Sequence, residues 1–279
     1  MTAPPPRSWL FVPADSEKKI AKALASEADA VILDLEDSVA AGRKKDAREI
    51  AVAALIQSGS GPQRWVRINP LDSGLVEDDL AAIGALPIAG VVLPKAERGA
   101  DIARLAAMLG GDMRIHAVAT ETAASLFGLG TYADAPRLAA MSWGAEDLSA
   151  ALGAASKYDA DGGLSFTYRM ARSLCLAGAV AAGVQPVDGV FADFRDAGGL
   201  CAESAAARRE GFTGKLAIHP DQVGPINAAF TPSCAEVAAA EQIVALFAAN
   251  PDAGTLALDG RMLDRPHLLQ AEQVLARRR

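Results

Sequence analysis

The sequence predicts an α/β fold, a (β/α)8 TIM barrel followed by a C-terminal helical extension and a lid tail. Eight short apolar runs recur along the chain, and Ala-rich stretches with helical spacing lie between them. Eight such units in roughly 230 residues match the size and strand count of a barrel better than those of a doubly wound sheet. The first turn, PADS at residues 13–16, also lacks the GxGxxG pattern typical of a doubly wound nucleotide-binding sheet.

The apolar runs have the length and composition of strands that are buried on both faces. They lie at residues 9–12, 30–35, 65–68, 90–93, 115–119, 139–143, 187–191 and 216–218. Helices are predicted between them at residues 17–26, 44–58, 101–109, 165–182 and 201–210. A further helix at 233–250 leads into a tail that a barrel does not need. We therefore expect a catalytic barrel over residues 1–232 and a C-terminal helix with a lid segment over 233–279.

Composition excludes several classes of protein. The 279 residues are 51% hydrophobic, and 34 acidic against 27 basic residues give a net charge that repels nucleic acid. Three cysteines, an odd number without a CxxC pair, argue against a disulfide framework. The first residues do not resemble a signal peptide, and no apolar run reaches the roughly 18 residues that a membrane span needs. We expect a cytoplasmic protein that binds neither nucleic acid nor a membrane.

Polar side chains follow the predicted strands at their carboxyl ends, where a TIM barrel builds its active site. In chain order they are Asp15, Asp34, Glu36, Asp37, Arg67, Asn69, Lys95, Thr120, Glu121, Thr122, Glu146, Asp147, Asp193, Asp196 and His219. Helix capping accounts for many of the acidic and hydroxyl side chains. It does not account for Arg67 or Lys95, which we interpret as ligands for anionic groups of a substrate.

Several carboxylates beside two cations predict a hard divalent metal ion, Mg²⁺ or alternatively Mn²⁺, because such ions take oxygen ligands. Zinc is disfavoured because His116, His219 and His267 have no HxxxH or HExxH spacing. GxSxG and Walker A motifs are absent from the sequence, which disfavours serine hydrolases and phosphoryl transfer. Lys95 is the one candidate for the amine of a Schiff-base aldolase.

Seven short motifs occur in order along nearly the whole chain. They are RSWLFVP at 7–13, AVILDLEDSV at 30–39, VRINP at 66–70, LPK at 93–95, ET at 121–122, GAEDL at 144–148 and IHP at 218–220. Together they resemble the HpcH/HpaI aldolase and citrate lyase family. Within it the chain is most similar to the citrate lyase beta subunit-like branch, which includes malyl-CoA and citramalyl-CoA lyases.

The resemblance implies that Glu121 and Asp147 hold Mg²⁺ and that Arg67 contacts the 2-oxo acid or the thioester oxygen. It also implies coenzyme A as part of the substrate. We assign Glu36 and Asp37 to the catalytic set, where they would order metal-bound water or Arg67. The other residues expected to bind substrate or coenzyme A are Phe11, Lys22, Lys95, Glu146, Ile218 and His219. Ser16 stands where several relatives have an arginine near the coenzyme A phosphates, and Lys18 and Lys19 are close enough to replace it.

Asp264, in the segment DGRMLD at 259–264, matches a family acid/base that closes over the active site of a neighbouring subunit. The resemblance therefore also implies a homo-oligomer, a trimer or a hexamer, and it explains the surplus tail. In this interpretation Asp264 protonates the carbon of a thioester enolate, or removes a proton from acetyl-CoA in the reverse direction.

The predicted function is a Mg²⁺-dependent carbon–carbon lyase that cleaves or forms a 3-hydroxyacyl-CoA such as citramalyl-CoA or malyl-CoA. The products of cleavage are acetyl-CoA and a 2-oxo acid, pyruvate or glyoxylate. Four alternatives stay open: a citrate lyase beta subunit acting on an acyl-carrier-protein thioester, a malyl-CoA thioesterase, a pyruvate aldolase that does not use coenzyme A, and a non-catalytic binding protein that keeps the barrel.

Overall fold

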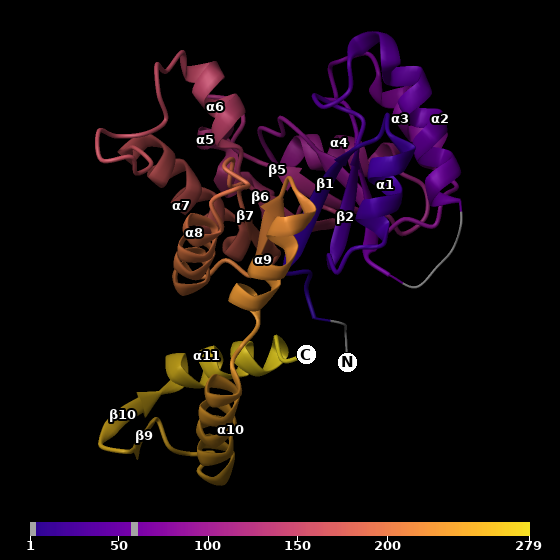
Figure 1. The fold of residues 1–279 in the computed structure, drawn as a ribbon. Coiled ribbons are helices and arrows are strands. Elements are labelled where there is room, and N and C mark those ends of the chain that lie inside the picture. The colour runs from indigo at the N-terminus through magenta and orange to yellow at the C-terminus, as the bar shows by residue number, and fades with distance from the viewer. Residues whose placement is uncertain (1–3, 57–60) are drawn as a thin grey trace.

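Eight parallel strands form a closed barrel in which neighbours in the chain are neighbours in the sheet and β1 pairs with β8 (Figure 1). The structure is a computed structural model that describes residues 4–56 and 61–279. The barrel strands are β1 (Ser8–Pro13), β2 (Ala30–Asp34), β3 (Gln63–Arg67), β4 (Gly90–Leu93), β5 (Arg114–Val118), β6 (Leu138–Ser142), β7 (Gln185–Asp188) and β8 (Gly214–Ala217). The predicted TIM barrel is confirmed.

Helices follow the strands and cover the outside of the barrel. They are α1 (Glu17–Leu24), α2 (Lys44–Leu55), α3 (Val76–Ile83), α4 (Gly99–Met108), α5 (Ser125–Gly128), α6 (Ala145–Leu152), α7 (Phe166–Ala181), α8 (Ala197–Glu210) and α9 (Val223–Phe230). Short 3-10 turns are η1 (Ala41–Arg43), η2 (Leu129–Tyr132) and η3 (Pro220–Gln222). The helix predicted over 44–58 ends at Leu55, and its predicted end at Ser58 lies outside the described residues.

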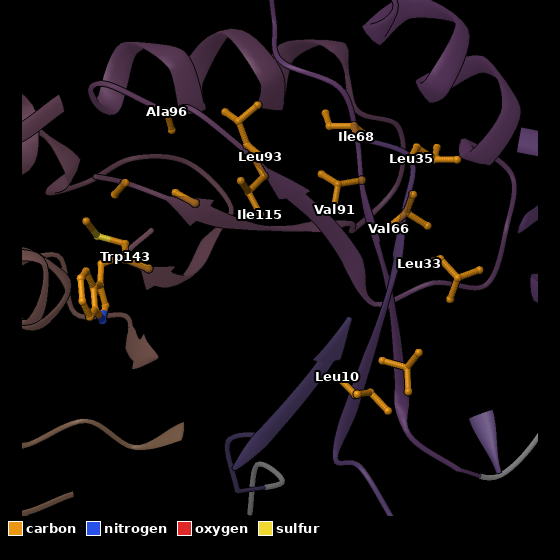
Figure 2. Close-up of a cluster of buried hydrophobic side chains, with 14 of the residues drawn as sticks. Leu10, Leu33, Leu35, Val66, Ile68, Val91, Leu93, Ala96, Ile115 and Trp143 are labelled. Atoms are coloured by element: carbon orange, nitrogen blue, oxygen red, sulfur yellow. The ribbon is translucent and has the colours of Figure 1, made fainter. Parts of the chain in front are cut away.

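The two faces of the strands carry two separate cores, because successive side chains of a strand point to opposite faces. Leu33, Val66 and Val91 belong to the large core between the barrel and its helices, which Figure 2 shows. Trp9, Ile32, Trp65, Val92, Val118 and Leu216 fill the barrel interior. His116 is buried beside Trp9, with ring centroids 4.7 Å apart, and its Nε2 lies 2.9 Å from Ser142 Oγ.

The same alternation places charged side chains at the upper end of the barrel interior. On β2, residues 30 and 32 point into the barrel, and Asp34 continues that face. On β3, Trp65 points inward and Arg67 is the next residue on the same face. The strand register pairs Asp34 with Arg67. The inward face is therefore apolar over most of its height and becomes ionic where the strands end.

The last two strands begin two residues earlier than predicted. Strand β7 ends at Asp188, whereas the prediction extended to residue 191, and β8 ends at Ala217. The apolar residues after Asp188 have left the ladder, and one of them, Val190, lines the cavity at the barrel mouth. The whole apolar run at residues 187–191 was therefore predicted as a strand, although part of it lines this cavity.

The C-terminal segment forms a separate unit from α10 (Cys234–Ala249), β9 (Thr255–Leu258), β10 (Arg261–Asp264) and α11 (Arg265–Ala276). Strands β9 and β10 form an antiparallel hairpin whose turn residues, Asp259 and Gly260, both have positive φ. Figure 1 shows this unit beyond the amino ends of the barrel strands, with the hairpin far from the barrel. The C-terminal residue of this unit, Arg279, contacts the N-terminal segment of the chain: its Nη2 donates to the Pro5 carbonyl at 2.7 Å.

Among the residues that the structure describes, one helical stretch, 220–249, is long and apolar enough to cross a membrane by length and composition alone. It consists of η3, α9 and α10, and the α9 and α10 helices are separated at residues 231–233. Ile226 and Phe230 of α9 are buried in the outer core of the barrel. The stretch is therefore an interrupted set of helices, of which α9 packs on the barrel.

Candidate active site

A cavity of about 300 Å³ opens at the carboxyl ends of the barrel strands. We call it the mouth cavity. Its polar lining consists of Asp34, Ser38, Arg67, Glu121, Glu146 and Asp147, and its apolar lining includes Phe11, Val118, Trp143, Val190 and Ile218. The structure thus brings together side chains from the ends of seven strands, as expected for the active end of this fold.

Arg67 is held at the floor of this cavity by two carboxylates. Its Nε and Nη2 donate to the two oxygens of Asp34 at 2.7 and 2.6 Å, and its Nη1 lies 3.0 Å from Glu36 Oε2. Burial by itself lowers the pKa of Arg67, but the hydrogen bonds and charges of Asp34 and Glu36 outweigh it and raise the pKa above its usual value. The guanidinium is therefore charged at every physiological pH.

The free donors of Arg67 face the cavity. A guanidinium has five N–H groups, and the contacts with Asp34 and Glu36 leave at least one on each terminal nitrogen. The ring of Phe11 lies against the guanidinium, with 4.7 Å between Cζ and the ring centroid. Arg67 thus presents a fixed pair of donors whose planar geometry suits a carboxylate or an enolate oxygen.

Glu121 and Asp147 lie together at one wall of the cavity. Glu121 is 4% exposed, and burial together with the charge of Asp147 raises the pKa of its carboxyl to about 8. Its Oε2 accepts a hydrogen bond from the backbone N–H of Lys95. Gly144 permits this placement, because a Cβ there would stand 2.7 Å from Glu121 Cγ.

The carboxylates of Glu121 and Asp147 fit a divalent cation. Burial and the charge of Asp147 raise the proton affinity of Glu121, and a hard cation that prefers oxygen ligands would supply balancing positive charge at this carboxylate. Over residues 4–56 and 61–279, no group of three or more His, Cys, Asp or Glu side chains is placed to hold a metal ion. Two protein carboxylates with the remaining positions left to water and substrate is the usual arrangement for Mg²⁺.

Lys95 joins the acidic loop after β2 to the Glu121–Asp147 pair. It has a positive φ of 53°, its Nζ contacts Glu36, and the same Nζ lies 3.1 Å from Asp37 and 3.4 Å from Asp147. Burial lowers its pKa, but Glu36 and the other carboxylates raise it well above the usual value. A lysine held as an ammonium ion is a poor Schiff-base nucleophile, so this geometry disfavours the Schiff-base alternative.

A network behind the site holds the loop of residues 35–37, and sequence reasoning missed its central member. Lys44, at the start of α2, donates to the carbonyl oxygens of Leu35 and Glu36 and to Asn69 Oδ1 at 2.7–2.9 Å. Asn69 in turn donates to buried Asp79 at 2.7 Å. A lysine in the first turn of a helix is predicted from sequence to be solvated, so this role is apparent only from the fold.

A second supporting contact fixes the aromatic wall of the cavity. The Trp143 indole N–H donates to Asp188 Oδ1 at 2.8 Å, and Asp188 also accepts from Arg172 and Lys215. Burial raises the pKa of Asp188, but the charges of Lys215 and Arg172 prevail and lower it to about 2. The fully buried Asp188 is therefore ionised, and it anchors an indole that sequence analysis did not assign to the site.

The residues expected to contact coenzyme A line a second cavity of about 310 Å³, which shares Phe11, Pro13 and Ile218 with the mouth cavity. Lys22 and His219 line it, and so does Lys19. The ring of His219 stacks on exposed Phe194, with centroids 4.8 Å apart. An apolar passage with two lysines on one wall therefore leads away from the mouth. The contact of Phe194 with His219 was not predicted from the sequence.

Two predicted residues are placed differently from the central group. Glu146 lines the rim of the mouth cavity, where it forms an ion pair with Lys157. Asp264 is the last residue of β10 and the N-cap of α11 in the C-terminal unit, and Figure 1 shows both elements away from the barrel. Its Oδ1 lies 2.5 Å from His267 Nδ1. Within one chain, Asp264 cannot reach Glu121 or Arg67 in this arrangement.

Comparisons with known proteins show the family to which the chain is related. The family model described as HpcH/HpaI aldolase/citrate lyase matches residues 7–220. A (3S)-malyl-CoA thioesterase of Cereibacter sphaeroides is 37% identical over 278 residues, which cover 99% of this chain and 95% of the relative. The mitochondrial citramalyl-CoA lyase of Homo sapiens is 33% identical over 299 residues, which cover 97% and 85%.

Among solved structures, the chain is similar to protein CitE from Mycobacterium tuberculosis in complex with magnesium, acetoacetate and coenzyme A. The TM-score is 0.82 at 35% sequence identity, and the match covers 99% of this chain and 97% of the other. The relatives and the solved structure match along nearly the full length, and the family model matches residues 7–220. The chain therefore belongs to the HpcH/HpaI aldolase/citrate lyase family, as its seven motifs predict.

Proposed function

We propose that this enzyme is a Mg²⁺-dependent carbon–carbon lyase that cleaves, or forms, a 3-hydroxyacyl-CoA such as citramalyl-CoA or malyl-CoA. One observation carries the proposal: buried Glu121 and half-buried Asp147 face the same cavity as the free N–H groups of Arg67. That cavity opens through Phe11 and Ile218 into a passage with two lysines. The relatives include a lyase for citramalyl-CoA and a structure with magnesium, a small oxo acid and coenzyme A.

Glu121 and Asp147 would hold the metal ion, and Mn²⁺ has the same oxygen preference. When bound, a divalent cation supplies Lewis-acid stabilisation of negative charge on the oxygens of the 2-oxo acid portion. Lys95 would keep the acidic loop in register with these ligands, because its ammonium group contacts both Glu36 and Asp147. Glu36 and Asp37 would act through Arg67 and Lys95 and would not touch substrate.

In the cleavage direction the substrate hydroxyl loses its proton and the carbon–carbon bond beside it breaks. The electron pair of that bond becomes a thioester enolate, and a 2-oxo acid remains. Arg67 donates to the enolate oxygen from the edge that Asp34 and Glu36 leave free. An acid then protonates the enolate carbon to give acetyl-CoA. The hydroxyl proton returns to solvent and the acid is recharged from solvent, so that the reaction consumes no net proton.

Asp264 is our candidate for that acid, supplied by a neighbouring subunit of a homotrimer or homohexamer. The separation of β10 and α11 from their own barrel supports an intermolecular role (Figure 1). Mixing tests it: Asp264→Asn and Arg67→Ala proteins, each inactive alone, should regain activity when subunits are exchanged. A mixture that stays inactive after verified subunit exchange would remove Asp264 of the partner from the mechanism.

Lys19, Lys22, His219 and Ile218 would bind the coenzyme A portion of the substrate, because their cavity adjoins the mouth. The competing possibility is that the thioester is carried on a carrier protein and not on free coenzyme A. The two lysines suit the phosphates of either carrier. Free coenzyme A and carrier-bound thioesters should therefore be compared as substrates. The free cysteines Cys175, Cys201 and Cys234 accord with a cytoplasmic location.

A thioesterase is the second candidate, because a relative at 37% identity carries that activity. The two reactions differ in products. With racemic malyl-CoA and citramalyl-CoA, first with Mg²⁺ and then with EDTA, we expect metal-dependent glyoxylate or pyruvate and no free thiol. Free thiol with malate or citramalate and no oxo acid would identify a thioesterase. Absence of both, with carrier-bound thioesters active, would identify a citrate lyase beta-type subunit.

A further inference from the structure

A third cavity, of about 300 Å³, lies where the barrel meets the C-terminal unit. We call it the junction cavity. It is lined by Ala205, Arg208, Arg209, Ala229, Glu236 and Arg277, which come from α8, α9, α10 and the residue that follows α11. Since the C-terminal unit lies beyond the amino ends of the strands (Figure 1), this cavity is at the opposite end of the barrel from the mouth cavity. It is therefore separate from the mouth cavity of the same chain.

The junction cavity has an excess of positive charge. Three guanidinium groups and one carboxylate line it, which leaves two positive charges unbalanced. The single carboxylate is already occupied: Glu236 accepts from Arg208 Nη2 at 2.7 Å and from the N–H and hydroxyl of Ser233 at 2.8 Å. In a chain of net charge −7, such a local excess needs a separate cause.

Arg277 and Arg209 have no carboxylate partner among the residues that the structure describes. Nε of Arg277 donates to the Gln273 carbonyl at 2.9 Å, and the N–H groups at the far end of its guanidinium make no hydrogen bond within residues 4–56 and 61–279. Burial and the charge of Arg208 lower the pKa of Arg277, and together they outweigh the opposing effect of the Glu236 charge. An anion bound in the junction cavity would therefore balance the positive charge of these guanidinium groups.

We propose that the junction cavity binds a phosphate-type oxyanion, either inorganic phosphate or the phosphoryl group of a small metabolite. Guanidinium groups donate in a planar fork that matches phosphoryl oxygens, and about 300 Å³ accommodates a phosphoryl group with a small substituent. The bound anion would bridge α8 of the barrel to α11 of the C-terminal unit. Because α11 begins after Asp264, occupancy would set the position of the proposed acid; this consequence alone rests on the proposed function.

The test measures binding without turnover. Isothermal titration of the intact protein with inorganic phosphate, and separately with a simple phosphomonoester, is carried out at constant ionic strength, with chloride as the comparison anion. We expect saturable phosphate binding that weakens about tenfold or more in Arg277→Gln and in Arg209→Gln, as for loss of one charge-assisted contact. Tighter binding of the phosphomonoester than of phosphate would identify a metabolite as the ligand.

Two controls make the result decisive. Arg278→Gln removes a neighbouring arginine that pairs with Glu241 and does not line the cavity, so it should bind phosphate like the unaltered protein. Lys22→Gln removes a cation of the proposed coenzyme A passage and should also leave phosphate binding unchanged. The proposal is overturned if Arg209→Gln and Arg277→Gln bind phosphate as the unaltered protein does, or if Lys22→Gln abolishes binding.

A second readout addresses the bridge. Hydrogen exchange at the α11 amides should slow when phosphate is added to the unaltered protein and should not change in Arg209→Gln. Arg209 is exposed on α8, so its substitution is compatible with folding even where Arg277→Gln is not. These outcomes do not depend on lyase activity, so an inactive lyase with intact phosphate binding would refute the proposed function and leave this inference standing.

Discussion

Asp34 and Arg67 are register partners on neighbouring strands. They form a bidentate ion pair in which Arg67 Nε and Nη2 donate to Asp34 Oδ1 and Oδ2 at 2.7 and 2.6 Å. The pairing follows from the alternation of side chains, since both residues continue inward-facing rows that are apolar lower in the barrel. Burial raises the pKa of Asp34, but the hydrogen bonds and charge of Arg67 prevail and hold it below its usual value. The catalytic cation of the proposed mechanism is thus positioned by the sheet itself.

Arg67→Lys should abolish this geometry while keeping the charge. A lysine cannot donate to both oxygens of Asp34 and still present a fixed edge to substrate. We expect kcat/KM to fall about 10²- to 10³-fold, as for loss of an oxyanion donor, with an unchanged circular dichroism spectrum. Turnover within a factor of about three of the unaltered enzyme would show that Arg67 is no oxyanion donor.

Metal binding should strengthen with pH. The pKa of Glu121 in the metal-free protein is raised to about 8, so below that pH its carboxyl is protonated and must lose the proton to bind a cation. We expect the thermal stabilisation by Mg²⁺ to increase from pH 6 to pH 8, measured by differential scanning fluorimetry. Glu121→Gln should show little Mg²⁺ stabilisation at any of these pH values.

The metal-free protein should show the opposite trend. Glu121 has a folded-state pKa above its unfolded value of 4.5, so its contribution to stability is present at low pH and is lost as pH rises from about 4.5 to about 8. Over that interval the unaltered metal-free protein should lose more stability than Glu121→Gln does, measured by urea unfolding. Parallel curves for the two proteins would contradict the raised pKa.

Gly144 should be required for the metal site and not for the fold. A Cβ at this position would meet Glu121 Cγ at 2.7 Å, so Gly144→Ala must displace the carboxylate. We expect Mg²⁺ affinity to fall about tenfold or more, measured by isothermal titration. Gly130→Ala is the matched control, since a Cβ there meets nothing within 4 Å. Equal affinities in the two variants would contradict the close packing.

Lys44→Met should loosen the acidic loop. The substitution removes the donor to the Leu35 and Glu36 carbonyl oxygens and should lower the free energy of unfolding by about 1–3 kcal/mol. Turnover should fall as well, because Glu36 positions both Arg67 and Lys95. Lys45→Met, an exposed neighbour on the same helix, should change neither property. Urea unfolding and initial rates measure the two effects.

The barrel could be predicted from the sequence because buried parallel strands produce a repeated apolar signal. The polar residues after each strand also converge as expected, since all eight carboxyl ends meet at one mouth. Asp34 could have been assigned to the site from its parity with residues 30 and 32. The hairpin of β9 and β10 carries the Asp259-Gly260 turn signal, which the sequence analysis did not use.

Other features depend on contacts between distant segments and leave no local pattern. From the sequence alone, Lys44 is expected on the solvated surface of a helix. Its role in holding the acidic loop depends on the packing of α2 beside the end of β3. Trp143 points at the cavity because Asp188, on the next strand, holds its indole. The junction cavity requires α11 to meet α8, which are more than fifty residues apart in the chain.

The most direct test of the central claim is the mass of the acetyl-CoA that forms when the enzyme and Mg²⁺ act on malyl-CoA or citramalyl-CoA in D2O. Cleavage through a thioester enolate predicts acetyl-CoA with one deuterium in its methyl group, together with glyoxylate or pyruvate. Free coenzyme A with malate or citramalate, and no acetyl-CoA, would contradict carbon–carbon cleavage and assign the site to thioester hydrolysis.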